Sequence, residues 1–379
     1  MISSKALNTL RLKCVRGISD NYLSRIYQTT GSLHDAFSLD YGSLTSLGIK
    51  KETAENIVTG DIDEALFEKE LSAVNRENAD IICIDDDEYP DLLKETEGAP
   101  ALLFVKGVAE TLQKPAIAVV GSRNATRQAC DFAKRLSQDL AEVGFNVVSG
   151  FALGIDVYAH AGAVNKGSTT AVMGCGINTF YPEANRRYQD IVLKNGCVVT
   201  EFFSDVPAYG GNFPQRNRII SGMSYGVVVV EASARSGSLI TARYAGEQGR
   251  EVFAVPAFPG TKNCMTNSLI KDGARLIEGY YDILEELKYR INGLKEVDNA
   301  DGHAIEFDSP DAEKIYALLE DGTLSPDEIS SKSGINIDTV TINLVQMELE
   351  GYLVREIDGK YQTAGGKHGQ NRNSAQSGN

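Results

Sequence analysis

Short apolar runs that alternate with amphipathic stretches of helical length constrain the fold more than any other feature of the chain. They are AIAVVG (116–121), FNVVSG (145–150), TTAVMG (169–174), CVVTEF (197–202), GVVVVEA (226–232) and EVFAVPA (251–257). Helical patterns fill the gaps, for example at 131–144 and 241–250. Continuously apolar strands that alternate with helices are typical of a parallel sheet with helices on both faces. We therefore predict an α/β fold with a doubly wound parallel sheet.

The sequence before this region has a different texture. Residues 1–75 form a pattern of short helices, and the segments 15–27 and 46–58 each place a Gly-Ile turn before an apolar helix. This layout resembles a sterile-alpha-motif or helix-hairpin-helix unit. Because the surroundings are acidic, we favour a packing or protein-contact role for it. Two more apolar runs, at 81–84 and 101–105, predict strands that join the large sheet.

A second small unit is predicted near the end of the chain. After a helical pattern at 280–291 and a polar linker, the sequence indicates three helices and a hairpin with an Asp-Gly turn, the layout of a winged helix. The final residues are poor in apolar side chains, and we expect them to be disordered. The predicted divisions are a helical domain, the sheet domain, a linker, the winged-helix-like domain and a tail, at 1–75, 79–291, 292–310, 311–364 and 365–379.

Charge is distributed unevenly along the chain, whose net charge is −15. Residues 1–114 carry 12 Lys and Arg against 20 Asp and Glu, a net of −8. Residues 115–290 carry 18 against 16, a net of +2, whereas residues 306–365 carry 4 against 13, a net of −9. A polyanion is repelled by both flanks but not by the middle region. Any site for such a ligand is therefore expected in the middle region. We predict that the fragment from about 80 to 290 binds without both flanks.

Cysteine and histidine usage gives no sign of a metal site or of disulfides. The chain has 6 Cys and 4 His, which are scattered without a C-x-x-C pair or zinc-type spacing. We expect buried, reduced thiols, no metal and no cofactor. No apolar run is long enough to span a bilayer, and the first residues lack the pattern of a signal peptide. We therefore expect a cytoplasmic protein with no membrane partner.

Unusual loops follow the predicted strands at the edge where doubly wound sheets bind ligands. Small residues at the first loop allow a ligand to approach the backbone, and the guanidinium of Arg123 presents a planar fork to a phosphate. Later loops carry more arginines and a hydroxyl-rich helix start at 236–242. The candidate phosphate-binding residues are Gly121, Ser122, Arg123, Ser149, Gly150, Gly154, Asp156, Arg186, Arg187, Arg216, Asn217, Arg218, Ser236, Gly237 and Ser238.

Several of the polar residues in these loops also have a purely structural interpretation. We favour a buried structural role for His160. Asp156 either contributes to the site, or caps a helix or bonds a neighbouring loop. Glu201 and Glu231, at strand ends, either form a general acid–base pair or orient the arginines, and we favour the second role.

The loop motifs, taken in order, resemble those of the DprA/Smf family of DNA-processing proteins. They are GSR (121–123), SGFALGID (149–156), GCGINTFYP (174–182), FPQRNRIISG (213–222) and SGSLITA (236–242). The resemblance covers about residues 80–290 and implies an extended Rossmann domain that binds single-stranded DNA and dimerises. It also implies a role in protecting single strands and in loading the recombinase RecA during recombination and natural transformation. Departures from the family pattern occur at Phe151, Ala257 and Met265, where Leu, Gly and Gly are commoner.

On this interpretation the protein is a binder and not an enzyme. Arg123, Arg216 and Arg218 are expected to line one track of phosphates, with Phe180, Tyr181 or Phe213 stacking on a base. The predicted recognition helix of the winged-helix-like domain has acidic residues but no Lys or Arg. We therefore favour protein contact over duplex binding for that domain.

Two alternatives remain open at this point. The first is an enzyme similar to nucleotide phosphoribohydrolases, which would need a P-G-G-x-G-T-type loop where this chain has SGSLITA. The second is a regulatory interaction protein that uses its acidic ends, which leaves the arginine-rich loops unexplained.

Overall fold

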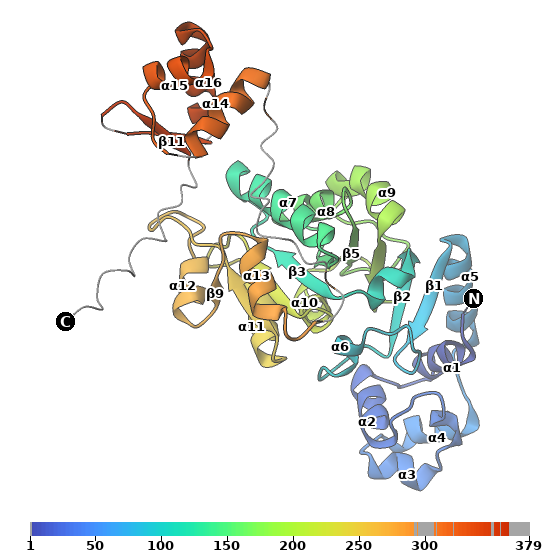
Figure 1. Cartoon of the computed structure of the whole chain (residues 1–379). Coiled ribbons are helices and arrows are strands. Elements are labelled where there is room, and N and C mark those ends of the chain that lie inside the picture. The colour runs from blue at the N-terminus through green and yellow to red at the C-terminus, as the bar shows by residue number, and fades with distance from the viewer. Residues whose placement is uncertain are drawn as a thin grey trace, which may run out of the picture. The chain divides into compact units, whose positions relative to one another are not determined.

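The computed structural model describes residues 2–291, 294, 307, 309–320, 322–349, 352–356 and 358–363 (Figure 1). The chain divides into two compact units, Met1–Glu296 and Val297–Asn379. The expected tail at 365–379 and most of the expected linker at 292–310 lie outside the described residues. Among the described residues, no helix is both long enough and apolar enough to cross a membrane.

A mixed sheet forms the centre of the first unit, with the order β1-β2-β6-β5-β4-β3-β7-β8-β9. Neighbouring strands run parallel throughout the part of the sheet that consists, in order, of β6, β5, β4, β3, β7, β8 and β9. The strand β2 is antiparallel to both β1 and β6. This arrangement confirms the predicted α/β fold with a large parallel sheet. The strands are β1 (Ala79–Cys83), β2 (Leu102–Gly107), β3 (Ala116–Val120), β4 (Asn146–Ser149), β5 (Ser168–Val172), β6 (Cys197–Thr200), β7 (Gly226–Val229), β8 (Glu251–Ala254) and β9 (Arg275–Leu276).

Helices cover both faces of the sheet, so every residue of β3, β4, β5, β6 and β7 is buried. The helices α7 (Arg127–Glu142), α8 (Ile155–Ala163) and α9 (Arg186–Asn195) follow successive strands on one face (Figure 1). The chain then returns to the other side of β3, and α10 (Asn212–Gly222) and α11 (Ser238–Glu247) cover the opposite face. The direction of winding therefore reverses between β3 and β7, where doubly wound sheets bind their ligands.

The N-terminal helices pack onto the edge of this sheet. Gly17 and Gly48 have φ values of +81° and +76°, so the two predicted Gly-Ile turns use a backbone conformation that favours glycine. The helices α1 and α5 contact β1 (Figure 1), and one continuous core includes Leu10, Ile81 and Phe104. The boundary between residues 75 and 79 remains a proposal. The helices are α1 (Ser4–Lys13), α2 (Asp20–Thr30), α3 (Tyr41–Ser46), α4 (Lys51–Thr59) and α5 (Glu64–Arg76).

Three further helices complete the first unit: α6 (Asp91–Lys94), α12 (Thr266–Lys271) and α13 (Tyr280–Leu287). Short 3-10 turns occur at Ala36–Ser38, Ala109–Gln113 and Glu183–Asn185. Every cysteine is free, and all but Cys264 are buried.

The second unit has the predicted order of three helices and a hairpin. Its elements are α14 (Pro310–Glu320), α15 (Pro326–Ser333), α16 (Ile337–Leu349), β10 (Leu353–Arg355) and β11 (Tyr361–Thr363). Its own core includes Ile315, Ile329 and Leu344. Ile342 and Val345 are exposed on α16. The helix, Ile337–Leu349, contains no Lys or Arg. This surface lacks the positive charge that a helix needs to enter a DNA groove.

Candidate DNA-binding site

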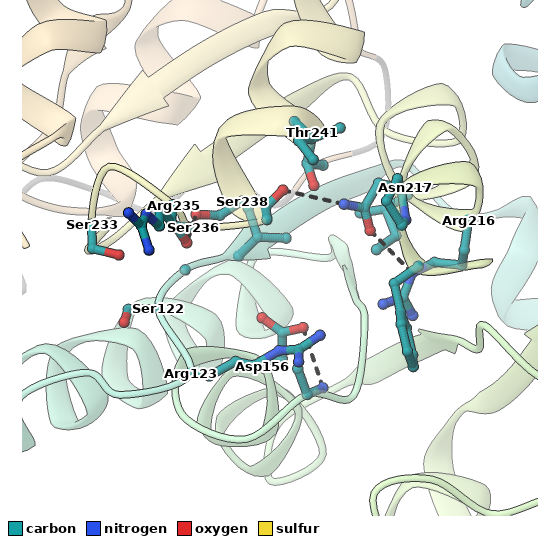
Figure 2. A pocket seen from close by; sticks show the side chains of 18 of the residues that line it. Ser122, Arg123, Asp156, Arg216, Asn217, Ser233, Arg235, Ser236, Ser238 and Thr241 are labelled. Atoms are coloured by element: carbon teal, nitrogen blue, oxygen red, sulfur yellow. Dashed lines mark hydrogen bonds between the residues drawn. The ribbon is translucent and has the colours of Figure 1, made fainter. Parts of the chain in front are cut away.

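A cavity of about 580 Å³ lies where the winding of the sheet reverses. Its walls come from the loops after β3 and β7 and from the starts of α10 and α11 (Figure 2). The lining includes these residues predicted from the sequence: Gly121, Ser122, Arg123, Asp156, Arg216, Asn217, Ser236, Gly237 and Ser238. It also includes polar residues that were not among the predicted candidates: Asn124, Ser233, Arg235 and Thr241, the last of which belongs to the SGSLITA motif.

The loop after β3 is held by Glu231, at the end of the neighbouring strand β7. The backbone N–H of Ser122 donates to the carbonyl of Glu231 at 2.7 Å, and the N–H of Thr126 donates to its Oε2 at 2.8 Å. A Cβ at Gly121 would lie 2.5 Å from Cγ1 of Ile155, so only glycine allows α8 to pack this closely. Glu231 therefore orients the loop itself, without contacting an arginine in the described part of the chain.

Two arginines in the cavity wall are exposed and have no hydrogen-bonding or ion-pair partner among the described residues. The guanidinium carbon of Arg123 lies 5.5 Å from the centre of the Phe213 ring. Arg235 lies in the loop before α11. A guanidinium without a carboxylate partner keeps its full charge and its planar set of donors for a phosphate. Arg235 immediately precedes the SGSLITA motif, and that position is the signal that sequence analysis missed.

The loop after β4 is a scaffold built around Asp156. Its Oδ2 accepts hydrogen bonds from the N–H groups of Gly150 and Ala152, at 3.1 and 3.3 Å. Burial raises the pKa of Asp156, and the nearby Arg216 opposes this shift. Gly154 has a φ of +78°, and a Cβ there would lie 2.3 Å from the carbonyl oxygen of Ser122. These contacts agree with a structural role for Asp156, which bonds the neighbouring loop. Asp156 also lines the cavity.

Ser149, at the end of β4, and Gly150, which follows it, belong to the same scaffold. Ser149 is buried, and its hydroxyl donates to the carbonyl of Val119 at 2.6 Å. Gly150 lines a small neighbouring cavity of about 40 Å³ that also touches Arg123.

Arg216 is buried at the floor of the cavity and ties the ends of two strands together. Its guanidinium donates to the carbonyls of Gly150, at 2.9 Å, and Val172. Its Nε donates to Oδ1 of Asn217, whose Nδ2 donates to the carbonyl of Gly237 at 3.2 Å (Figure 2). Burial lowers the pKa of Arg216 to about 10, so it still carries a positive charge at neutral pH.

Other predicted arginines do not line this cavity. Arg218 is largely buried and forms an ion pair with Glu201, whose pKa is raised by burial. Arg186 pairs with Glu183 at 2.6 Å on the surface. Arg187 lies over the ring of Tyr188. The structure therefore gives Glu201 the role of orienting an arginine, and it places Arg218 outside the expected phosphate track.

The start of α11 presents hydrogen-bond donors to the cavity. The N–H groups of Gly237 and Ser238 have no partner among the described residues, as is usual at the beginning of a helix. The hydroxyls of Ser236 and Ser238 lie 2.7 Å apart, so at least one of their two protons points elsewhere. The helix dipole adds partial positive charge here. Together with Arg123 and Arg235, this end of the cavity favours an anion.

Two aromatic rings, Tyr181 and Phe213, form what we call the aromatic shelf. Their ring centres lie 5.4 Å apart, and both line the cavity. Gly174 lies under Phe213, and a Cβ there would be 2.8 Å from Cδ1 of the ring. Phe180, the other predicted aromatic, instead packs edge-on against Phe151.

His160 has the favoured structural role. It is buried, its Nδ1 lies 2.6 Å from the hydroxyl of Thr169, and burial lowers its pKa to about 3. Within the described part of the chain, no group of His, Cys, Asp or Glu residues is arranged to hold a metal ion.

Comparison with known proteins identifies the family. The model of the family "DNA recombination-mediator protein A" matches residues 80–288, more than half of the chain. The chain belongs to the DprA/Smf family. A model of the DprA winged helix domain also matches residues 301–359. The family resemblance and the winged-helix assignment made from the sequence are thus confirmed.

Individual DprA and Smf proteins show the same relationship. Protein Smf of Escherichia coli strain K12 is 38% identical over 299 residues, covering 76% of this chain and 78% of that protein. DprA of Streptococcus pneumoniae strain R6 is 43% identical over 207 residues, covering 54% and 73%. The X-ray structure of Streptococcus pneumoniae DprA matches with a TM-score of 0.65 at 34% identity, over 74% of this chain and 97% of that one.

A solved structure of DprA from Helicobacter pylori, described by its single-stranded DNA binding mode, also matches. The TM-score is 0.50 at 26% identity, over 55% of this chain and 96% of that chain. DprA/Smf proteins are recombination mediators that bind DNA, and they are not enzymes. The phosphoribohydrolase-like alternative is therefore set aside.

Proposed function

We propose that this DprA/Smf protein binds single-stranded DNA in the cavity between β3 and β7. The observation that carries the proposal is that Arg123, 5.5 Å from the ring of Phe213, and Arg235 line the same cavity as the aromatic shelf. Neither has a hydrogen-bonding or ion-pair partner in the described part of the chain. Phosphates would bind between these guanidinium groups and the start of α11, while an unstacked base lies on Tyr181 and Phe213. Base stacking on an aromatic side chain contributes about 1–3 kcal/mol per base.

The geometry favours a single strand over a duplex for a simple reason. The bases of a duplex are stacked on one another, so their faces are not available to Tyr181 or Phe213. The single-stranded DNA named for the Helicobacter pylori relative supports the same ligand class. The cavity residues divide by role on this proposal.

The residues that would contact DNA are Gly121, Ser122, Arg123, Arg235, Ser236, Gly237 and Ser238. Those that would hold the loops in shape are Ser149, Gly150, Gly154, Asp156, Arg216 and Asn217. The remaining predicted arginines would not contact DNA on this proposal: Arg186 and Arg187 make surface contacts, and Arg218 stabilises the fold through its ion pair.

We further propose the finer role that the family resemblance implies. The protein would protect single strands and help to load RecA onto them, acting as a homodimer in the cytoplasm, including during natural transformation where the organism takes up DNA. The acidic flanks, with net charges of −8 and −9, are suited to protein contacts and not to DNA.

Titration by fluorescence anisotropy tests the DNA proposal. A short labelled single strand and the duplex of the same sequence are titrated with the full chain at several salt concentrations. We expect tighter binding of the single strand and a negative slope of log affinity against log salt. Equal affinity for the duplex, or no binding of the single strand, would overturn the proposal. A RecA filament-formation assay with and without the protein tests the loading role separately.

A further inference from the structure

A buried carboxylate outside the cavity holds the loop after β6. Glu70, in α5, has no exposed surface, and neither has Ser204, in the loop after β6. Oε2 of Glu70 accepts a hydrogen bond from the N–H of Ser204 at 2.8 Å, and its Oε1 accepts one from the Ser204 hydroxyl at 3.0 Å. Both carboxylate oxygens are thus used on one residue of a loop that is 134 positions away in sequence.

The loop that Glu70 holds is joined to the loop after β5. The N–H of Asn178 donates to the carbonyl of Ser204 at 3.0 Å, and the N–H of Gly176 donates to that of Val206 at 2.8 Å. The fit is close, because a Cβ at Gly176 would lie 2.3 Å from the carbonyl oxygen of Ser204. The two loops are therefore closely packed and joined by backbone hydrogen bonds at this point.

Each of these loops leads to one ring of the aromatic shelf. The loop after β5 continues from Asn178 to Tyr181, and the loop after β6 continues to Phe213 at the start of α10. The ring centres lie 5.4 Å apart, a spacing that depends on both loops. Ser204 is therefore bonded to the loop that carries Tyr181 and lies in the loop that leads to Phe213.

We infer that Glu70 is a positioning residue, which fixes the aromatic shelf for base stacking from the N-terminal helical segment. This inference rests on the proposed binding of single-stranded DNA. It gives the helical segment a part in the site although none of its residues lines the cavity. The arginines that would hold phosphates lie on other loops, so Glu70 should affect stacking but not phosphate contacts.

The test uses the full chain and a single strand that contains 2-aminopurine, whose fluorescence falls when it stacks. In Glu70→Leu the amide and hydroxyl of Ser204 lose their acceptor in a buried place. We expect weaker quenching at saturation and an affinity about tenfold lower, within the contribution of one stacked base. The salt slope should stay unchanged. Ser204→Ala, which removes one of the two bonds, should show a smaller effect in the same direction.

Two controls separate positioning from general stability. Glu70→Gln should restore quenching, because its oxygen still accepts from the Ser204 amide and its NH₂ donates to the hydroxyl. Lys69→Ala should leave all readouts unchanged, because its pair with Asp205 at 2.8 Å is exposed and contributes little.

Unchanged quenching in folded Glu70→Leu and Ser204→Ala would overturn the inference while leaving DNA binding intact. If Glu70→Leu does not fold, Ser204→Ala alone decides. Failure of the unmodified protein to bind the strand would instead refute the proposed function, and the inference with it.

Discussion

Arg216 and Arg218 lie two residues apart on α10 but serve opposite sides of the helix. The guanidinium of Arg216 bonds to carbonyls at the ends of β4 and β5, whereas Arg218 pairs with Glu201. A helix turns by about 100° per residue, so side chains two apart point in nearly opposite directions. Only Arg216 can therefore face the cavity.

The first prediction concerns the salt dependence of DNA binding. Each phosphate that is neutralised on a single strand contributes about −0.7 to the slope of log affinity against log salt. Arg123→Ala and Arg235→Ala should each reduce the magnitude of the slope by about this amount. Arg123→Lys should keep the slope but bind more weakly, because lysine lacks the planar fork. Anisotropy titrations at several salt concentrations measure both effects.

Arg127→Ala is the matched control for these variants. Arg127 is a highly exposed arginine close to Arg123 in sequence, and it does not line the cavity. If its removal changes the slope as much as that of Arg123, the effect comes from general charge and not from a defined phosphate site.

The second prediction concerns the ion pair of Arg218 and Glu201. Arg218→Met should leave the carboxylate of Glu201 buried without its partner and lower the free energy of unfolding by about 3 kcal/mol. The double variant with Glu201→Leu should recover much of this loss, because no uncompensated charge remains. Urea denaturation measures both. A reduced salt slope of DNA binding in folded Arg218→Met would show that Arg218 contacts phosphate after all.

The third prediction is a pH dependence of stability due to His160. Its pKa is lowered to about 3 in the folded protein, whereas an unfolded histidine titrates near 6.5. Below about pH 6.5 the unfolded chain therefore binds a proton that the folded chain does not. Stability is fully present above this pH and falls as the pH drops towards 3, by at most about 1.4 kcal/mol per pH unit.

His160→Gln removes this titration. Urea denaturation between pH 7 and pH 5 should therefore show a flatter dependence in the variant than in the unmodified protein. Parallel curves for the two proteins would mean that His160 binds its proton at the same pH in the folded and unfolded states.

The fourth prediction concerns which part of the chain binds DNA by itself. The fragment 1–296 should keep the affinity of the full chain for a single strand, because the described lining of the cavity runs from Val120 to Thr241, within the first unit. The charge distribution alone favours a shorter fragment, from about 80 to 290. Because Leu10 shares a core with Ile81 and Phe104, we now expect that shorter fragment to unfold at lower urea. Equal stability of the two fragments would argue against this dependence.

The sheet and the location of the cavity were predictable because both depend on local patterns. Strands buried on both faces are continuously apolar, and the carboxyl ends of such strands meet at one edge. The partner of Arg218 was not predictable in this way, because its pair with Glu201 depends on the rotation of α10 against the sheet. Arg186 instead pairs with Glu183, three residues before it, which is a local spacing.

Glu70 shows a signal that is present in the sequence but easily misjudged. It follows Phe67 by three residues and precedes Val74 by four, which places it on the buried face of α5. A charged residue at such a position is normally assigned to the surface, because buried carboxylates are rare. Its partner, Ser204, is identified only by the fold.

The bonds from Glu231 to the loop after β3 have a consequence for the entropy of binding. They join the ends of two strands that are distant in sequence, so the loop from Ser122 to Thr126 is in place before any ligand arrives. A preorganised receptor loses little conformational freedom on association. The ordering cost therefore falls on the nucleic acid, and a flexible strand that must be straightened loses more entropy than one whose backbone already follows the cavity.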